Sequence, residues 1–350
     1  MTCLQAHARA RRTRRSLTAA AIQIAALLLV VPDAAPASGA AITDSDARQS
    51  LEDAWWTGPI LAASAASVPR GHFLVEPYFY DTILAGRFDQ DGAHRSASRS
   101  HRVRFATFAL YGLSDRVSVG VIPTFGFNRA SSGPRSSLGL GDLSLQAQYR
   151  LTDFRQGRPI PTTSILLTAT IPTGKYDRLG LHPEDGLGNG AYTAAASVYT
   201  QYYFWLPTGR LLRTRLDLSF SISDRVNLHD VSVYGTSQGF RGHAAPGDSF
   251  VAYVSGEYSV TRNWVLALEV AYQHGDNTRV IGRNLIKLVH TVNAIEYEAN
   301  SGSSRSTALA PELEYNWSSR VGLLMGAIFT VSGRNAGETI TPVLAINYNL

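Results

Sequence analysis

Residues 264–273 read WVLALEVAYQ, and this stretch decides the fold class. Large apolar side chains occupy every second position from Trp264 to Tyr272, and the positions between them hold small or polar residues, Glu269 among them. A period of two residues is typical of a β-strand with one apolar and one polar face. About ten residues are enough for a tilted strand to cross a bilayer. The stretch therefore predicts a membrane-spanning strand whose apolar face contacts lipid.

The same alternation recurs along the chain from residue 72 onward. It predicts about twelve strands, at residues 72–83, 102–112, 117–128, 142–151, 161–173, 190–205, 210–222, 248–260, 264–275, 306–317, 320–331 and 338–350. Their connections alternate between short turns and long polar loops, the latter at 84–101, 129–141, 174–189, 223–247 and 276–305. Short periplasmic turns and long extracellular loops are typical of outer-membrane barrels. We therefore predict an all-β fold, an antiparallel transmembrane β-barrel of about twelve strands over residues 71–350.

A closed barrel is favoured because the bilayer core holds no water to satisfy the backbone groups of a free sheet edge. A secreted β-sandwich is the alternative, since its strands alternate in the same way. Sandwich strands are typically about five or six residues long, however, and many segments here are about twice that length. Aromatic residues also gather near the segment ends, as they do in the interfacial girdles of membrane barrels.

Residues 1–40 have the layout of a cleaved secretory signal peptide. Five arginines between Arg9 and Arg15 precede an apolar stretch, and a run of small residues leads to a cleavage site expected after Ala40. A membrane anchor is the alternative, although the apolar stretch is short for a span. Residues 41–70 are predicted to be a periplasmic lead-in or a plug inserted into the barrel.

The charge excess of the chain belongs mostly to its first forty residues. These hold five of the 32 Lys and Arg residues and one of the 27 Asp and Glu residues, so the remainder carries a net charge near +1. Such a balance predicts no nucleic-acid partner. The single cysteine, Cys3, lies in the same segment, so the processed chain can form no disulfide and no thiolate metal site. We expect neither a metal nor a cofactor.

The polar face of the predicted strands would line the lumen. It carries the charged residues that we take as candidate permeant contacts: Glu76, Arg102, Arg104, Asp142, Arg150, Arg213, Arg215, Asp217, Glu257, Glu269, Glu312 and Glu314. Basic residues dominate the earlier strands and acidic residues the later ones, so the lumen would have two walls of opposite charge. These walls would either orient a polar permeant in a transverse field or form an ion-pair network that fills a narrow barrel. Both alternatives stay open.

The sequence contains no catalytic motif in the structural context that its chemistry requires. Residues 235–239 match the pattern G-x-S-x-G, but they fall in a predicted loop rather than in the strand–turn–helix that this nucleophile motif requires. The histidines show no H-E-x-x-H zinc motif. The sequence therefore predicts no enzyme.

Several short motifs resemble a known family. WTGP at 56–59, PRGHF at 69–73, GLGDLS at 139–144 and ATIPTGKYD at 169–177 are similar to proteins grouped as transporters of the meta-pathway of phenol degradation. The resemblance implies a bacterial outer-membrane barrel that acts as a channel for aromatic or other small hydrophobic molecules. A structural or adhesive barrel with a closed lumen and ligand-binding loops is the alternative function.

The expected partners follow from that location. They are the permeant, outer-membrane lipid and lipopolysaccharide, whose phosphates the arginines of residues 84–104 could contact unless this loop is merely solvated. The barrel-assembly machinery is expected to read the C-terminal strand. Such strands usually end in an aromatic residue, whereas this chain ends in Leu350, which keeps the apolar phase.

Overall fold

The computed structural model describes residues 48–130, 135–288 and 291–350. The predicted signal peptide and residues 41–47 lie outside the described residues. Apart from two single-turn 3₁₀ helices, η1 (Leu51–Asp53) and η2 (Pro183–Asp185), the regular structure is β. Among the described residues, no helix is long and apolar enough to span a bilayer.

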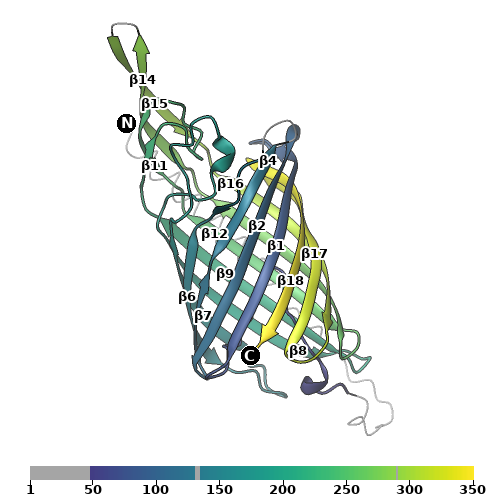
Figure 1. Ribbon diagram of the computed structural model, residues 1–350. Coiled ribbons are helices and arrows are strands. Elements are labelled where there is room, and N and C mark those ends of the chain that lie inside the picture. Colours follow the sequence, from purple (N-terminus) through teal and green to yellow (C-terminus); the bar gives the residue numbers. More distant parts are fainter. Residues whose placement is uncertain (1–47, 131–134, 289–290) are drawn as a thin grey trace, which may run out of the picture. The chain divides into compact units, whose positions relative to one another are not determined.

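A closed antiparallel barrel of twelve strands forms the body of the chain, as Figure 1 shows. In barrel order the strands are β1 (Phe73–Phe88), β2 (His94–Ser114), β3 (Val117–Ile122) continued by β4 (Thr124–Ala130), β6 (Leu143–Thr152) preceded by β5 (Gly139–Leu140), β7 (Thr162–Ile171), β8 (Thr193–Trp205), β9 (Leu211–Ser223), β12 (Ser249–Ser259), β13 (Trp264–Gly275), β16 (Ser304–Asn316), β17 (Val321–Arg334) and β18 (Ala336–Asn349). Pairing of β18 with β1, in which Tyr78 lies opposite Ala345, closes the ring. The predicted fold class is confirmed.

The two-residue period of the sequence becomes the two faces of the barrel wall. On β13, Leu266 and Leu268 are 52% and 53% exposed and face outward. Glu269, the next residue, is fully buried and faces the interior. Bare apolar side chains on the outer face are stable only in contact with lipid. The short turns lie at the side of the barrel where β1 begins and β18 ends. We assign this side to the periplasm.

Three of the long predicted loops, 84–101, 223–247 and 276–305, are wrong in part, because they contain strands. Residues 84–101 were expected to be a loop, but β1 and β2 extend into a hairpin in which Arg87 pairs with Arg95. This part of the wall needs no apolar face, so its sequence lacks the alternation on which the prediction depended.

A second sheet at the extracellular end was also missed. It consists of β10 (Val226–His229), β11 (Phe240–Ala245), β14 (Arg279–Leu288) and β15 (Thr291–Asn300), all within segments predicted to be loops. Phe240 and Leu228 are fully buried in its own small core. A hydrogen bond from the Gly239 backbone N–H holds the pKa of Asp230 below its ordinary value, so this carboxylate stays ionised and fixes the β10–β11 turn. β10 and β11 are short, with four and six residues, and polar or charged residues and glycines interrupt the alternation in β11 and β14.

Candidate functional site

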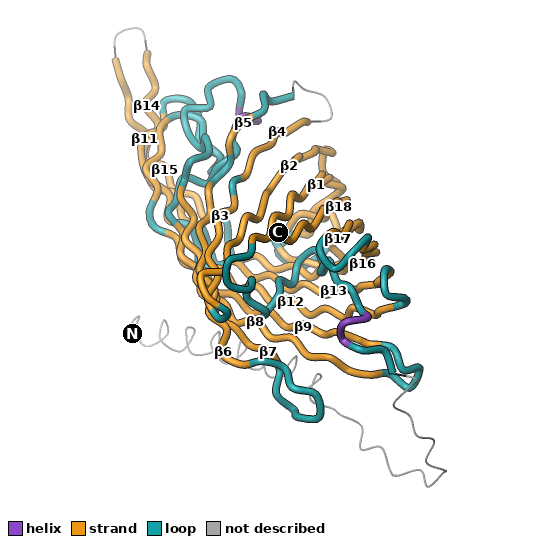
Figure 2. The backbone as a smooth tube through the Cα atoms, turned by 60° about the horizontal axis from the view of Figure 1, so that its bottom comes forward, coloured by secondary structure: helices purple, strands orange, loops and turns teal. Residues whose placement is uncertain are grey.

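The segment before β1 enters the barrel at its periplasmic mouth. The backbone N–H of Gln49 donates to the Gly209 carbonyl at 3.0 Å, and the Trp205 indole donates to the Gln49 carbonyl at 2.8 Å. The Trp55 N–H donates to the carbonyl of Arg262 in the β12–β13 turn. Figure 2, with the periplasmic end turned forward, shows η1 and the loop that follows it against the ring of strands. We call residues 55–68 the plug segment.

Wall carboxylates bind the plug segment through its backbone. Glu314 accepts from the N–H groups of Thr57 and Gly58 at 2.6 and 3.1 Å, and Glu312 accepts from that of Ile60 at 3.0 Å. The first half of the plug segment is therefore held along β16 by groups that recognise any backbone.

The same contact continues around the ring of strands. Glu269 of β13 accepts from the N–H groups of Leu61 and Ala62 at 2.8 and 2.7 Å. Asp217 of β9 accepts from that of Ala63 at 2.7 Å. Consecutive plug residues thus bond to strands in their order around the ring, from β16 to β13 and β9, and the plug segment runs along the inner wall as a belt.

Neutral polar groups hold the second half of the belt. The Ser164 hydroxyl of β7 donates to the Ala65 carbonyl at 2.5 Å, and the Gln148 amide of β6 donates to the Ser64 carbonyl at 3.0 Å. Ser67 reaches the Asp115 carbonyl in the β2–β3 turn. From there the chain turns into β1, so the plug segment contacts the inner wall from β16 to the β2–β3 turn.

Small side chains make these close backbone contacts possible. Residues 62–67 read AASAAS, and Ala62 and Ala65 are completely buried. Gly58 has a φ of +108°, which L side chains rarely adopt, and a Cβ there would meet the Arg215 guanidinium at 3.3 Å. A larger residue at a buried position would therefore push the belt away from the wall.

We expect Ala65→Leu to displace the plug segment, because overpacking a filled site typically costs about 1–3 kcal/mol. The check is the labelling rate of Ser64→Cys by a membrane-impermeant maleimide, in a chain whose natural Cys3 is replaced by serine. Labelling should be about tenfold faster with Ala65→Leu, the factor that corresponds to about 1.4 kcal/mol. Ala63→Leu is the matched control because the Ala63 side chain is exposed. Equal rates in the two variants would contradict a tightly seated belt.

A buried ion-pair cluster supports the belt from the wall. Arg213 binds both carboxylate oxygens of Glu257, and the Nε atom of Arg215 lies 3.0 Å from Glu257 Oε1. Arg215 also donates to the Ala62 carbonyl at 2.8 Å, and the Arg213 guanidinium lies 4.3 Å from the centroid of the Trp56 ring. These arginines are paired with the neighbouring strand and the plug segment, so they do not form an open wall opposite the acids.

Seven of the twelve predicted lumen residues gather at the plug segment: Arg213, Arg215, Asp217, Glu257, Glu269, Glu312 and Glu314. Glu76 lies at the edge of this group, where it accepts a hydrogen bond from Asn347. Their role as permeant contacts stays a prediction.

The other four predicted residues lie apart from the plug segment. Arg104 donates to Asn128, and Arg102 beside it is exposed. Arg150 lies at the periplasmic end, 2.9 Å from an oxygen of Asp153.

Asp142 does not face an open lumen, because its carboxylate clasps an extracellular loop. It accepts from the backbone N–H groups of Gly174 and Asn189 at 3.0 and 2.8 Å. A Cβ on Gly188 would come within 2.6 Å of the Gly174 carbonyl oxygen, so both glycines are needed for this close approach. The motif GLGDLS at 139–144 and the motif ATIPTGKYD at 169–177 are thus joined by the hydrogen bond from Gly174 to Asp142.

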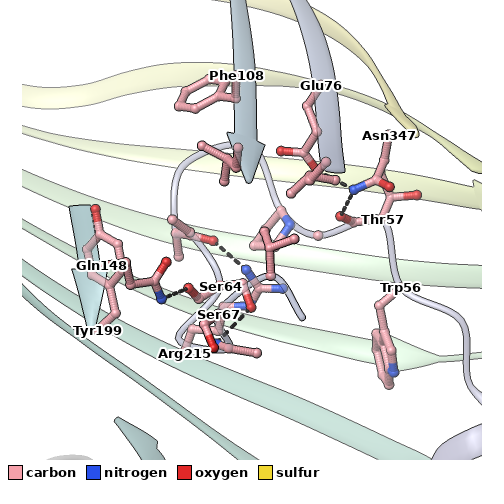
Figure 3. Close-up of a pocket in the computed structure, with 18 of the residues that line it drawn as sticks. Trp56, Thr57, Ser64, Ser67, Glu76, Phe108, Gln148, Tyr199, Arg215 and Asn347 are labelled. Carbon is pink, nitrogen blue, oxygen red and sulfur yellow. Dashed lines mark hydrogen bonds between the residues drawn. The ribbon is translucent and has the colours of Figure 1, made fainter. Parts of the chain in front are cut away.

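The plug and the wall enclose a cavity of about 420 Å³. Figure 3 shows Phe108 and Glu76 around it, with the plug residue Ser64 beside Gln148 and the plug residue Thr57 beside Asn347. Further lining residues are Leu74, Tyr78, Leu110, Gln146 and Leu166. Apolar and hydrogen-bonding groups are therefore mixed on its surface. In the described part of the chain, no group of three or more His, Cys, Asp or Glu residues could hold a metal ion.

Barrel, polar interior and lipid-facing apolar surface define a bacterial outer-membrane β-barrel. The family described as "Putative MetA-pathway of phenol degradation" matches residues 70–344, and the chain belongs to it. The resemblance seen in the sequence is confirmed. The search of curated proteins finds no match.

Solved structures with a similar fold are outer-membrane proteins. An outer membrane channel from Pseudomonas putida F1 is 15% identical, with a TM-score of 0.62, and the match covers 83% of this chain and 100% of that one. The β-domain of the Bordetella autotransporter BrkA is 8% identical at a TM-score of 0.39, covering 80% and 100% of the two chains. The translocator domain of NalP from Neisseria meningitidis is 12% identical at 0.39, covering 79% and 87%. Of these, only the first likeness is close enough to support the fold.

Proposed function

We propose that this protein is a channel for small molecules and that the plug segment is its resting closure. The observation that carries the proposal is the belt of backbone hydrogen bonds along the inner wall. These bonds join a polar wall to a polar backbone, and both sides can bond to water instead once the belt leaves. A permanent filling would more naturally be an apolar core, which cannot exchange its contacts for water in this way.

The apolar anchoring of the plug segment is correspondingly small. Ile60 packs in a buried apolar cluster with Tyr78, Leu324 and Val343, and the partly buried Leu61 packs against the same cluster. Full burial of one such side chain contributes about 1.5–3 kcal/mol. A closure held by two apolar side chains and a row of exchangeable hydrogen bonds is suited to opening without unfolding the barrel.

We infer that the permeant is a small molecule with an aromatic or aliphatic body and a polar group. The cavity beside the plug is of a size for one such molecule, with Phe108 and Leu166 for its body and Gln148 and Glu76 for its polar group. The family description, a pathway of phenol degradation, supports the same class. We propose no catalytic role for the barrel.

The decisive experiment compares the full barrel with a variant that lacks residues 55–66. Both are reconstituted in planar bilayers for conductance and in liposomes for uptake of phenol, benzoate and glucose. We expect rare openings from the full barrel and a persistent open pore from the variant, whose folding is checked by its heat-modifiable electrophoretic mobility. Lack of conductance and uptake in a folded deletion variant would overturn the channel.

A second function, adhesion, is favoured by the extracellular sheet. Its four strands have their own buried core, so this sheet is a built structure rather than a set of connections. Deletion of β14 and β15 separates the two functions. A channel should keep its permeation without them, whereas an adhesive barrel should lose binding to its ligand.

We also propose that the assembly machinery reads β18 despite its terminal leucine. Ile346 and Tyr348 keep the outward apolar phase up to the end of the strand, and both are 44% exposed. Leu350 is 55% exposed and continues the same row.

A further inference from the structure

The outer face of β1, β2 and β4 carries an ordered apolar row toward its extracellular end. The rings of Phe79 and Phe105 lie 5.3 Å apart, and those of Phe105 and Phe125 lie 4.9 Å apart in a stacked arrangement. The strand register places Leu344 at one end of this row and Leu140 at the other. Figure 1 shows these strands side by side in the front wall. This row is a lipid-facing surface.

A row of basic residues lies four positions farther along the same strands. Register places His101 opposite Arg129, and Arg129 forms a bridge with Arg135. Four residues of a strand span about 13 Å, so the basic row lies about 13 Å above the aromatic row along the strands. Both arginines are exposed.

The two arginines lack a compensating acid. Like charges directly opposite each other on neighbouring strands destabilise a sheet. In the described part of the chain, neither Arg129 nor Arg135 forms an ion pair, and the nearest such pair in the row is that of His101 with Asp81 at 3.0 Å. The guanidinium of Arg135 lies 4.2 Å from the centroid of the Phe127 ring, which holds it at the outer surface. An anion between the arginines would remove the repulsion.

We propose that this patch, made of the aromatic row and Arg129 and Arg135, binds lipid A, the diphosphorylated glycolipid of the outer leaflet. Its acyl chains lie along the aromatic row, and one phosphate bridges the two guanidinium groups. Arginine matches phosphate geometry through paired N–H donors. A lipid whose phosphates lie above its acyl chains fits a surface on which basic residues lie above aromatic ones. This site is separate from the lumen and independent of the proposed channel.

The test measures binding of lipid A to the full chain in detergent micelles, by native mass spectrometry. R129Q/R135Q is compared with R116Q/R320Q, which removes two exposed arginines from periplasmic turns. We expect at least tenfold weaker binding for the first variant and unchanged binding for the second. Equal binding by both variants would overturn the site.

A second arm tests the ligand on the unaltered protein. Diphosphorylated lipid A should bind more tightly than its monophosphorylated form, and both more tightly than phosphatidylglycerol. If phosphatidylglycerol binds as well as lipid A, the patch is a general anionic-lipid surface and the assignment to lipid A is wrong.

Discussion

Replacement of Glu269, Glu312 and Glu314 by glutamine is expected to raise the open probability of the channel at least tenfold. Together these three carboxylates accept five backbone N–H groups of the plug segment. Glutamine keeps the size and one acceptor oxygen but replaces the second oxygen with an N–H donor, and each hydrogen bond lost contributes about 0.5–1.5 kcal/mol. A loss of about 1.4 kcal/mol already shifts the closed-to-open equilibrium tenfold. Single-channel recording of the reconstituted barrel measures the change.

The control keeps the number and type of substitutions and changes their place. Glu184, Glu298 and Glu338 lie at the extracellular end, where each pairs with a basic residue or histidine outside the lumen. Their triple replacement by glutamine should leave the open probability unchanged. If both triple variants open equally, general loss of negative charge explains the effect and the carboxylates do not hold the plug.

The barrel could be predicted because lipid imposes its period directly on the sequence. β13 shows this, because the large apolar Leu266 faces lipid and the acidic Glu269 is buried on the inner face, although the apolar Val265 is buried there too. Above the lipid this constraint ends. The hairpin with Arg87 and Arg95 and the sheet around Phe240 lie there, and both were predicted as loops.

The belt along the inner wall could not be predicted in the same way. Its contacts run from backbone N–H groups to Glu269, Glu312 and Asp217, and backbone groups are identical in every sequence. The residues themselves indicated only a plug or a lead-in. The run AASAAS at 62–67 indicates that this backbone can approach another surface closely, because its side chains are small. It does not indicate which strands form that surface.

Asp142 shows a second limit of sequence patterns. Its place in the alternation predicts a lumen-facing side chain, and its charge makes it a candidate permeant contact, but it lies just before β6 begins at Leu143. The alternation does not predict that the extracellular loop folds back over this strand. In that loop the close approach of Gly174 and Gly188 brings two backbone N–H groups to the carboxylate. Side-chain direction followed from the period, whereas partners depend on segments distant in the chain.

The largest loss of stability is expected from Glu257→Leu. Glu257 is completely buried and is the carboxylate that faces both Arg213 and Arg215, so its removal leaves two guanidinium groups in the interior without this counter-ion. Breaking a buried pair from one side typically costs about 3–5 kcal/mol. Urea unfolding of the barrel in detergent, followed by tryptophan fluorescence, should show a lower midpoint. Glu298→Leu breaks a solvent-exposed pair with Arg279 and should leave the midpoint unchanged.

The compensated variant separates loss of charge balance from loss of packing. In R213L/R215L/E257L no buried charge of this cluster remains, and replacement of a whole buried ion cluster by apolar residues is often neutral or stabilising. We expect its midpoint to lie above that of Glu257→Leu. The plug segment would still lose the hydrogen bond from Arg215 to Ala62 and the contact of Arg213 with Trp56. A stable barrel with frequent openings would therefore show that the cluster serves closure more than folding, whereas a midpoint as low as that of Glu257→Leu would contradict the charge-balance argument.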